Sequence, residues 1–124
     1  MKFFKCDTCG KVIMAVVETA VPTMCCGKPM RELVAGTTDG AKEKHVPVYE
    51  VKDGKVYVSV GSVEHPMLPE HYITMIALET KCGAQIAQLQ PGQAPKAVFP
   101  LMEGDEVVAV YEYCNLHGLF KAEI

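Results

Sequence analysis

Four cysteines within the first 26 residues constrain this chain more than any other feature. Cys6 and Cys9 have Cys-x2-Cys spacing, and the adjacent pair Cys25 and Cys26 follows after a gap of 15 residues. A Cys-x2-Cys turn folds back on itself, so two sulfurs can bind one ion while backbone amides hydrogen-bond to them. Adjacent cysteines must lie in a tight turn to share that ion, and Gly27 directly after them fits such a turn. Four thiolates suit either zinc or a single iron.

The segment around these cysteines, to about residue 36, is too short to fold on apolar burial alone. A bound metal is therefore expected to contribute much of its stability. Gly36-Thr37-Thr38-Asp39-Gly40 then has the composition of a linker. The charge changes at the same place, because residues 1–36 carry five basic and three acidic side chains and residues 37–124 carry seven and twelve. The sequence thus predicts two domains, 1–36 and 37–124.

The second domain has the pattern of β-structure. Val56, Val58 and Val60 alternate with more polar residues, and Asp53-Gly54 separates this run from Pro47–Lys52, which is typical of a hairpin. Five further strand-like runs are Tyr72–Thr80, Ala84–Gln90, Lys96–Leu101, Glu106–Tyr113 and Leu119–Glu123. Seven short strands without a clear helix predict a mainly β chain, in which the small metal module precedes an immunoglobulin-like seven-stranded antiparallel β-sandwich.

The histidines indicate a second metal site, in the sandwich. His45, His65, His71 and the motif Cys114-x2-His117 all lie at predicted strand boundaries or loops, where a sandwich gathers its functional side chains. Four neutral imidazoles and one thiolate would leave one octahedral position open, and they suit ferrous iron better than tetrahedral zinc. A β-sandwich binding module without metal chemistry is the simpler alternative for this half of the chain.

Composition argues against several other classes. The net charge is −3, tryptophan is absent and lysine and arginine form no stripe, so no nucleic-acid role is expected. The apolar runs are far shorter than the roughly 20 residues that cross a bilayer, so no membrane role is expected either. Met1–Lys5 leads directly into the first cysteine without the pattern of a signal peptide. Together with the Cys-x2-Cys spacing, this predicts a cytoplasmic metal-binding chain rather than a disulfide-linked one.

The motifs resemble those of known families. The segment from Cys6-Asp7-Thr8-Cys9-Gly10 to Cys25-Cys26-Gly27-Lys28-Pro29-Met30 is similar to desulforedoxin. Four later segments resemble superoxide reductase: Thr38–Pro47, Gly61–Met67, Glu70–Ile73 and Tyr113–Gly118. The chain as a whole therefore resembles desulfoferrodoxin, the two-iron form of that enzyme.

This resemblance implies two iron ions per chain. One would be a distorted tetracysteine centre bound by Cys6, Cys9, Cys25 and Cys26. The other would be held in a plane by His45, His65, His71 and His117, with Cys114 binding from below. Cys82 matches no ligand position and is interpreted as a free cysteine packed in a strand-to-turn region.

The resemblance also implies a function. Superoxide would be reduced by one electron to hydrogen peroxide without oxygen release, as a detoxification reaction. Glu43 and Lys44 would lie on a mobile loop over the open face, where Lys44 attracts the anion and orders water and Glu43 ligates ferric iron after product leaves. A rubredoxin-type electron donor and a homodimer are further implied. A pure electron carrier and a structural zinc protein remain alternatives, and an open position beside Lys44 would favour the enzyme.

Overall fold

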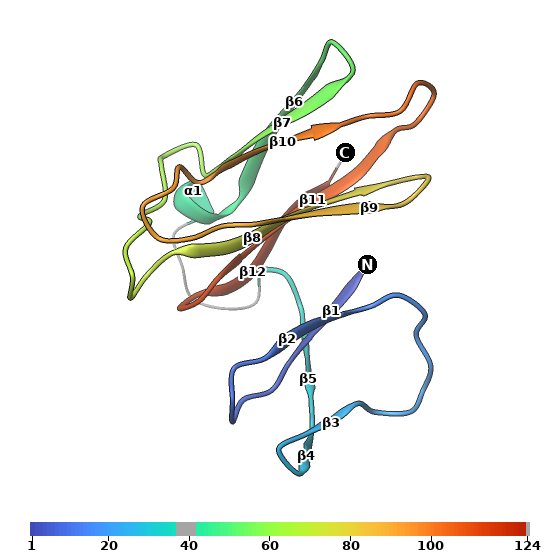
Figure 1. Ribbon diagram of the computed structural model, residues 1–124, viewed down its shortest axis with the longest axis vertical. Coiled ribbons are helices and arrows are strands. Elements are labelled where there is room, and N and C mark those ends of the chain that lie inside the picture. Colours follow the sequence, from blue (N-terminus) through green and yellow to red (C-terminus); the bar gives the residue numbers. More distant parts are fainter. Residues whose placement is uncertain (37–41, 124) are drawn as a thin grey trace. The chain divides into compact units, whose positions relative to one another are not determined.

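The computed structural model describes residues 1–36 and 42–123 and divides the chain into two compact units, Met1–Val34 and Ala35–Ile124 (Figure 1). Both units are built from strands, which confirms the predicted mainly β class. One helical turn, α1 (Lys42–His45), precedes the second unit's first strand and was not anticipated from the sequence. Within the described ranges, no helix has the length and apolar character needed to cross a membrane.

The first unit contains a small antiparallel sheet and a hairpin. The sheet has the order β2–β1–β5, with β1 at Lys2–Lys5, β2 at Val12–Ala15 and β5 at Arg31–Leu33. The hairpin consists of β3 (Met24–Cys25) and β4 (Lys28–Pro29). Few apolar side chains are buried here, namely Phe3, Cys6, Met30 and Leu33 among those described. A core of this size agrees with the expectation that metal binding stabilises the unit.

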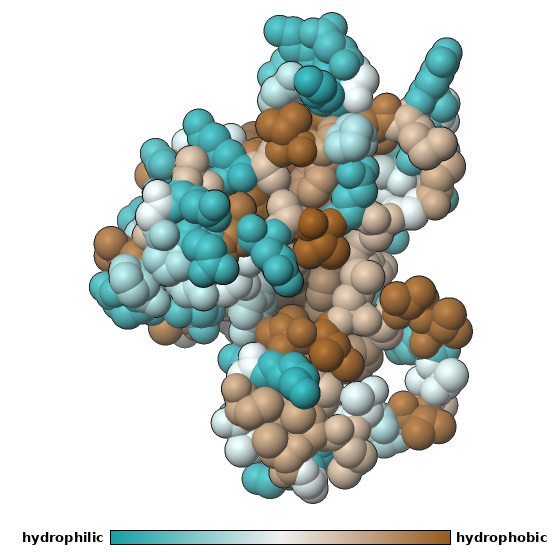
Figure 2. All heavy atoms as spheres, viewed as in Figure 1, coloured by the Kyte–Doolittle hydropathy of each residue, from teal (hydrophilic) through white to brown (hydrophobic). Residues whose placement is uncertain are grey.

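The loop between β2 and β3 exposes apolar side chains instead of burying them. Val16, Val17 and Val21 are 86%, 84% and 77% exposed. Figure 2 shows hydrophobic side chains at two places on this loop, at the right of the view, with more polar side chains between them. Contiguous exposed apolar surface is often covered by another protein.

The second unit is the predicted sandwich of two antiparallel sheets (Figure 1). One sheet has the order β10–β7–β6, and its strands are Lys96–Pro100, Lys55–Val60 and Pro47–Lys52. The other has the order β12–β11–β8–β9, and its strands are Gly118–Glu123, Val107–Cys114, Ile73–Thr80 and Ala84–Gln88. Each of the seven predicted runs lies within two residues of an observed strand at both ends.

The alternation in β7 determines which face of its sheet is buried. Val56, Val58 and Val60 are at most 2% exposed and belong to the core, whereas Tyr57 between them is 40% exposed. Asp53 and Gly54 have φ values of +52° and +72°, so both lie in the left-handed region that a two-residue hairpin turn requires. The predicted hairpin is therefore confirmed.

The central strand pair of the larger sheet has a register shift at each end, and one of the two lies near the predicted ligands. In the pairing of β11 with β8, Tyr113 lies opposite Met75 and Cys114 opposite Ile73, so Thr74 is an extra residue in β8. The hydroxyl of Thr74 donates a hydrogen bond to the Tyr113 carbonyl at 3.2 Å. This bulge lies where β11 ends at Cys114, directly beside the predicted ligands.

Candidate metal centres

The four cysteines of the first unit form one cluster. Their sulfur atoms all lie within 4.8 Å of one another, and the Cys9 and Cys25 sulfurs are 3.7 Å apart. Metal–sulfur bonds of about 2.3 Å in a tetrahedron place sulfurs about 3.8 Å apart, so this spacing fits a four-sulfur metal site. Cys6 is buried whereas Cys9 and Cys26 are exposed, so the cluster lies at the surface of its unit.

Two tight turns bring these sulfurs together. The backbone amide of Cys9 donates to the Cys6 sulfur at 3.4 Å, as expected for a Cys-x2-Cys turn. Cys26 and Gly27 occupy the β3–β4 turn with φ values of +53° and +75°. The predicted tight turn is confirmed, and Cys26 is a non-glycine residue in the left-handed region, a conformation that costs roughly 1–2 kcal/mol.

The thiol pKa values in this cluster are shifted in opposite directions. The backbone amide of Cys9, which points at the sulfur of Cys6, lowers the pKa of Cys6 to about 6. The pKa of Cys25 is raised to about 12, first because its thiol shares hydrogen bonds with Cys6 and Cys9. Without a cation, a thiolate is thus favoured at Cys6 over Cys25, whereas a bound cation stabilises further thiolates.

The second cluster has four histidine rings arranged close to a square. Neighbouring ring centroids are 4.5 Å (His45–His65), 4.7 Å (His65–His71), 5.1 Å (His71–His117) and 4.8 Å (His45–His117) apart. The His45–His71 diagonal is longer, at 6.5 Å. Adjacent rings are inclined by 65° to 83°, and one nitrogen of each ring lies within 4.8 Å of a nitrogen of every other ring.

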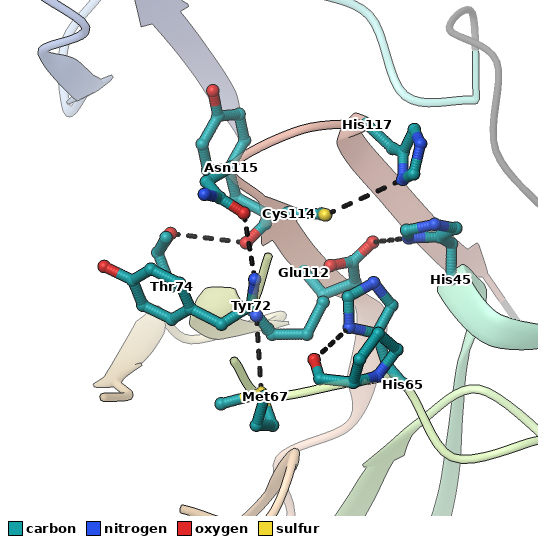
Figure 3. Close-up of polar contacts among 12 residues, drawn as sticks. His45, His65, Met67, Tyr72, Thr74, Glu112, Cys114, Asn115 and His117 are labelled. Carbon is teal, nitrogen blue, oxygen red and sulfur yellow. Dashed lines mark hydrogen bonds and ion pairs between the residues drawn. The ribbon is translucent and has the colours of Figure 1, made fainter. Parts of the chain in front are cut away.

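A buried thiol completes this cluster. The sulfur of Cys114 lies 3.9 Å from Nδ1 of His117, and one ligand atom from each of the five residues lies within 4.8 Å of every other (Figure 3). The Nε2 atoms of His65 and His71 are buried and have no hydrogen-bond partner in the described part of the chain. Buried nitrogens of this kind are normally paired. The five residues therefore fit a metal ion.

Neighbouring groups orient two of these rings. Nδ1 of His65 lies 2.7 Å from the Pro66 carbonyl oxygen, which can only accept, so the proton is on Nδ1 and Nε2 is free to bind a metal. The ring of Phe120 stacks on His45 with centroids 4.6 Å apart and planes inclined by 18°. Sequence reasoning missed Phe120, because a phenylalanine in a strand is usually a core residue.

Burial favours the neutral form of three histidines of this site. It lowers the pKa of His45 to about 4, and it also lowers the pKa values of His65 and His71. Burial raises the pKa of the Cys114 thiol, although the backbone amides of His117 and Leu116 oppose that shift. Neutral imidazoles are the form that binds metal, so this part of the site is ready for an ion at neutral pH.

Three further residues singled out from the sequence are Glu43, Lys44 and Cys82. Lys44 is exposed on α1, immediately before His45. Glu43 belongs to α1, but its side chain lies outside what the structure describes, and residues 37–40 of the predicted linker also lie outside the described ranges. Cys82 is exposed in the turn after β8 and belongs to neither cluster.

The chain is similar in sequence and in structure to known proteins. The desulfoferrodoxin family model matches residues 37–123. A desulfoferrodoxin from Syntrophotalea carbinolica is 45% identical, over 99% of this chain and 96% of its own. The superoxide reductase structure from Treponema pallidum superposes with a TM-score of 0.83 at 40% identity, covering 98% of each chain. The one-iron superoxide reductase from Giardia intestinalis gives a TM-score of 0.57 at 33% identity, covering 67% of this chain and 98% of its own. The chain belongs to the desulfoferrodoxin family.

Proposed function

We propose that this protein is a superoxide reductase, which reduces superoxide by one electron to hydrogen peroxide and releases no oxygen. The observation that carries the proposal is the near-square of four histidine rings with the Cys114 sulfur among the same ligand atoms. Five ligands of this mix leave a sixth position for a small substrate and suit ferrous iron. Iron bound there would supply the electron, and two protons complete the product.

The charge of the ligand set favours an anionic substrate. Imidazoles bind a metal in their neutral form, so the thiolate of Cys114 would contribute the only negative charge among the five ligands once a cation has displaced its proton. The site with a divalent cation then has a net positive charge, which attracts superoxide. Because the site is buried, salt screens this attraction less than it would screen charges at the surface.

Lys44 is proposed to act on the substrate before and after electron transfer. Its side chain is exposed and lies next to a proposed ligand, His45, in the sequence. Its ammonium group attracts the anion and holds water from which the product is protonated. Glu43 is proposed to close the sixth position after product leaves.

The first unit is proposed to hold a second iron as an electron-transfer centre, bound by Cys6, Cys9, Cys25 and Cys26. The sulfur spacing supports a tetrahedral ion, and zinc remains the alternative at this site. A rubredoxin-type protein is the proposed electron donor, and the cytoplasm, where thiols remain reduced, is the proposed location.

A homodimer is also part of the proposal. The exposed valines of the β2–β3 loop support it, because such surface is commonly buried between subunits. Sedimentation of the wild type beside a Val17→Lys variant would test whether this loop takes part. A monomeric wild type would contradict the dimer.

The reaction is tested by its stoichiometry. The purified protein is assayed for iron per chain, and superoxide is then supplied with and without an external electron donor. We expect two irons per chain, one peroxide formed per superoxide consumed, and turnover only with the donor. Catalytic oxygen release without a donor would show a dismutase, and a second site containing only zinc would refute the reductase. Reversible iron oxidation with no effect of superoxide would favour the electron carrier.

A further inference from the structure

Asn115 connects two separate parts of the second metal site through three hydrogen bonds, of which Figure 3 shows the one between its side chain and the Tyr72 backbone amide. Its side-chain oxygen Oδ1 accepts from the Tyr72 backbone amide at 2.9 Å, and its side-chain Nδ2 donates to the Glu70 carbonyl at 3.0 Å. Its own backbone amide donates to the Tyr72 carbonyl at 3.2 Å. These contacts surround His71, while Asn115 itself directly follows Cys114.

The contacts arise from the bulge at the end of the β8–β11 pair. Beyond the pair of Cys114 with Ile73, backbone pairing continues only through the Asn115 amide, because the chain turns after Cys114 to begin β12 at Gly118. The side-chain carbonyl of Asn115 accepts the Tyr72 amide in place of a backbone carbonyl. It therefore extends the strand pairing by one residue past the point where regular backbone pairing ends.

An asparagine side chain matches the hydrogen-bonding groups that surround it here. The Tyr72 amide can only donate and the Glu70 carbonyl can only accept, so the orientation of the side-chain amide is determined. Asparagine offers an acceptor and a donor on one short side chain, whereas aspartate at neutral pH offers acceptors only. This is the only asparagine in the chain.

The other side of the Glu70–Tyr72 segment is also fixed. Leu68 and His71 exchange two backbone hydrogen bonds, of 2.9 and 3.0 Å, which close a tight turn around Glu70. The backbone of His71 is thus held from one side by this turn and from the other by Asn115. The turn that carries Cys114 and His117 has the same Asn115 within it.

We propose that Asn115 is a positioning residue, which holds the Cys114–His117 turn against the segment that carries His71. It fixes the position of the Cys114 thiolate relative to the His71 imidazole without binding the metal itself. This inference rests on the proposed iron site and adds to it a specific determinant of ligand geometry. Outer hydrogen bonds of this kind commonly tune metal affinity by about 10- to 100-fold.

The test uses two variants and a matched control in the iron-loaded protein. Asn115→Ala removes both side-chain bonds, and Asn115→Asp retains the acceptor for Tyr72 but loses the donor to Glu70. Gln85→Ala and Gln85→Glu are the controls, because Gln85 Nε2 donates to the Pro100 carbonyl at 2.7 Å, also a side-chain amide bond to a backbone carbonyl. Gln85 lies opposite Leu78 in β8, away from the ligands near Ile73.

Three readouts are measured: iron loss to a chelator, the electron paramagnetic resonance spectrum of the ferric second site, and its sulfur-to-iron absorption. We expect both Asn115 variants to lose second-site iron about tenfold faster than the wild type and to show altered ferric spectra. Iron in the first unit should be retained equally in all variants. The Gln85 variants should match the wild type in all three readouts.

Amide hydrogen exchange gives a further measurement, made on the wild type and on both Asn115 variants. In the wild type, the Tyr72 amide and the amides of β8 should all exchange slowly, and Asn115→Ala but not Asn115→Asp should remove the protection of Tyr72. Fast exchange of Tyr72 in the wild type would overturn the inference. Unchanged iron loss and spectra in both Asn115 variants would also overturn it, even if their melting temperatures fall. A wild type without iron in this cluster would instead refute the proposed function.

Discussion

Oε1 of Glu112 lies 3.6 Å from Nδ1 of His45, and the two side chains are only 0% and 3% exposed (Figure 3). Glu112 is in β11, opposite Ile76 and Phe120 of the two neighbouring strands. Its carboxyl oxygens have no hydrogen-bond partner within the described ranges. Burial raises the pKa of Glu112 to about 9, so at neutral pH this contact joins a neutral acid to a neutral imidazole.

The first prediction concerns how stability of the metal-free protein depends on pH. Glu112 has a folded-state pKa near 9, above its usual 4.5, so the native state binds more protons than the unfolded state between these values. The free energy of unfolding that Glu112 contributes is fully present below pH 4.5. It is lost as the pH rises toward 9, with a slope of at most about 1.4 kcal/mol per pH unit. Glu112→Gln should flatten this decline.

The measurement for Glu112 is urea unfolding of the metal-free protein at pH 6, 7, 8 and 9. The raised pKa of Cys114 acts in the same direction from about pH 9 upward, whereas the lowered pKa of Cys6 acts in the opposite direction, so the quantity compared is the difference in slope between wild type and Glu112→Gln. His45, whose pKa is lowered to about 4, acts below pH 6.5, where its contribution is lost as the pH falls. Identical slopes above pH 7 in wild type and Glu112→Gln would contradict the prediction.

The second prediction concerns attraction of substrate by Lys44. Lys44→Ala should slow the reaction with superoxide and weaken its dependence on ionic strength, because attraction of an anion is a screened Coulomb effect. Pulse radiolysis at several salt concentrations measures both quantities. Lys55→Ala is the matched control, since it removes the same charge at the far end of the β6–β7 hairpin. Equal slowing by both changes would mean that only net charge matters.

The third prediction separates the two metal centres. Cys26→Ser should remove or weaken iron binding in the first unit and leave the second site intact, because the two ligand sets share no residue. Iron per chain and the visible spectrum measure this, and Cys82→Ser serves as the control that retains both irons. Loss of both spectral signatures in Cys26→Ser would refute independent centres.

The fourth prediction concerns the ring that supports His45. Phe120→Leu should lower the free energy of unfolding by about 1–2 kcal/mol, since it leaves unfilled volume and removes the stacked contact with His45. It should also alter the ferric spectrum of the second site. Phe99→Leu is the control, because Phe99 is similarly buried in the core. A spectral change of equal size in both variants would indicate general loosening.

The strands and ligand types could be predicted from the sequence because their signals are local. The alternation of apolar and polar residues around Val58 and the Asp53-Gly54 turn each depend on residues that are adjacent in the sequence. The structure has both the buried strand face and the turn where they were predicted. The same holds for Cys26 and Gly27, whose turn follows from the need of two adjacent thiols to meet. Local geometry alone is enough in each case.

Tertiary structure decided the arrangement and support of the second site. Glu112 lies between two tyrosines in a strand, and nothing in that local pattern shows that its carboxyl is fully buried beside His45. The roles of Asn115 and Phe120 depend on the β8–β11 bulge and on the β11–β12 pairing, which join residues far apart in the chain. The sequence determined which side chains could bind a metal. Strand register determined how they meet, because it depends on packing of the whole sandwich.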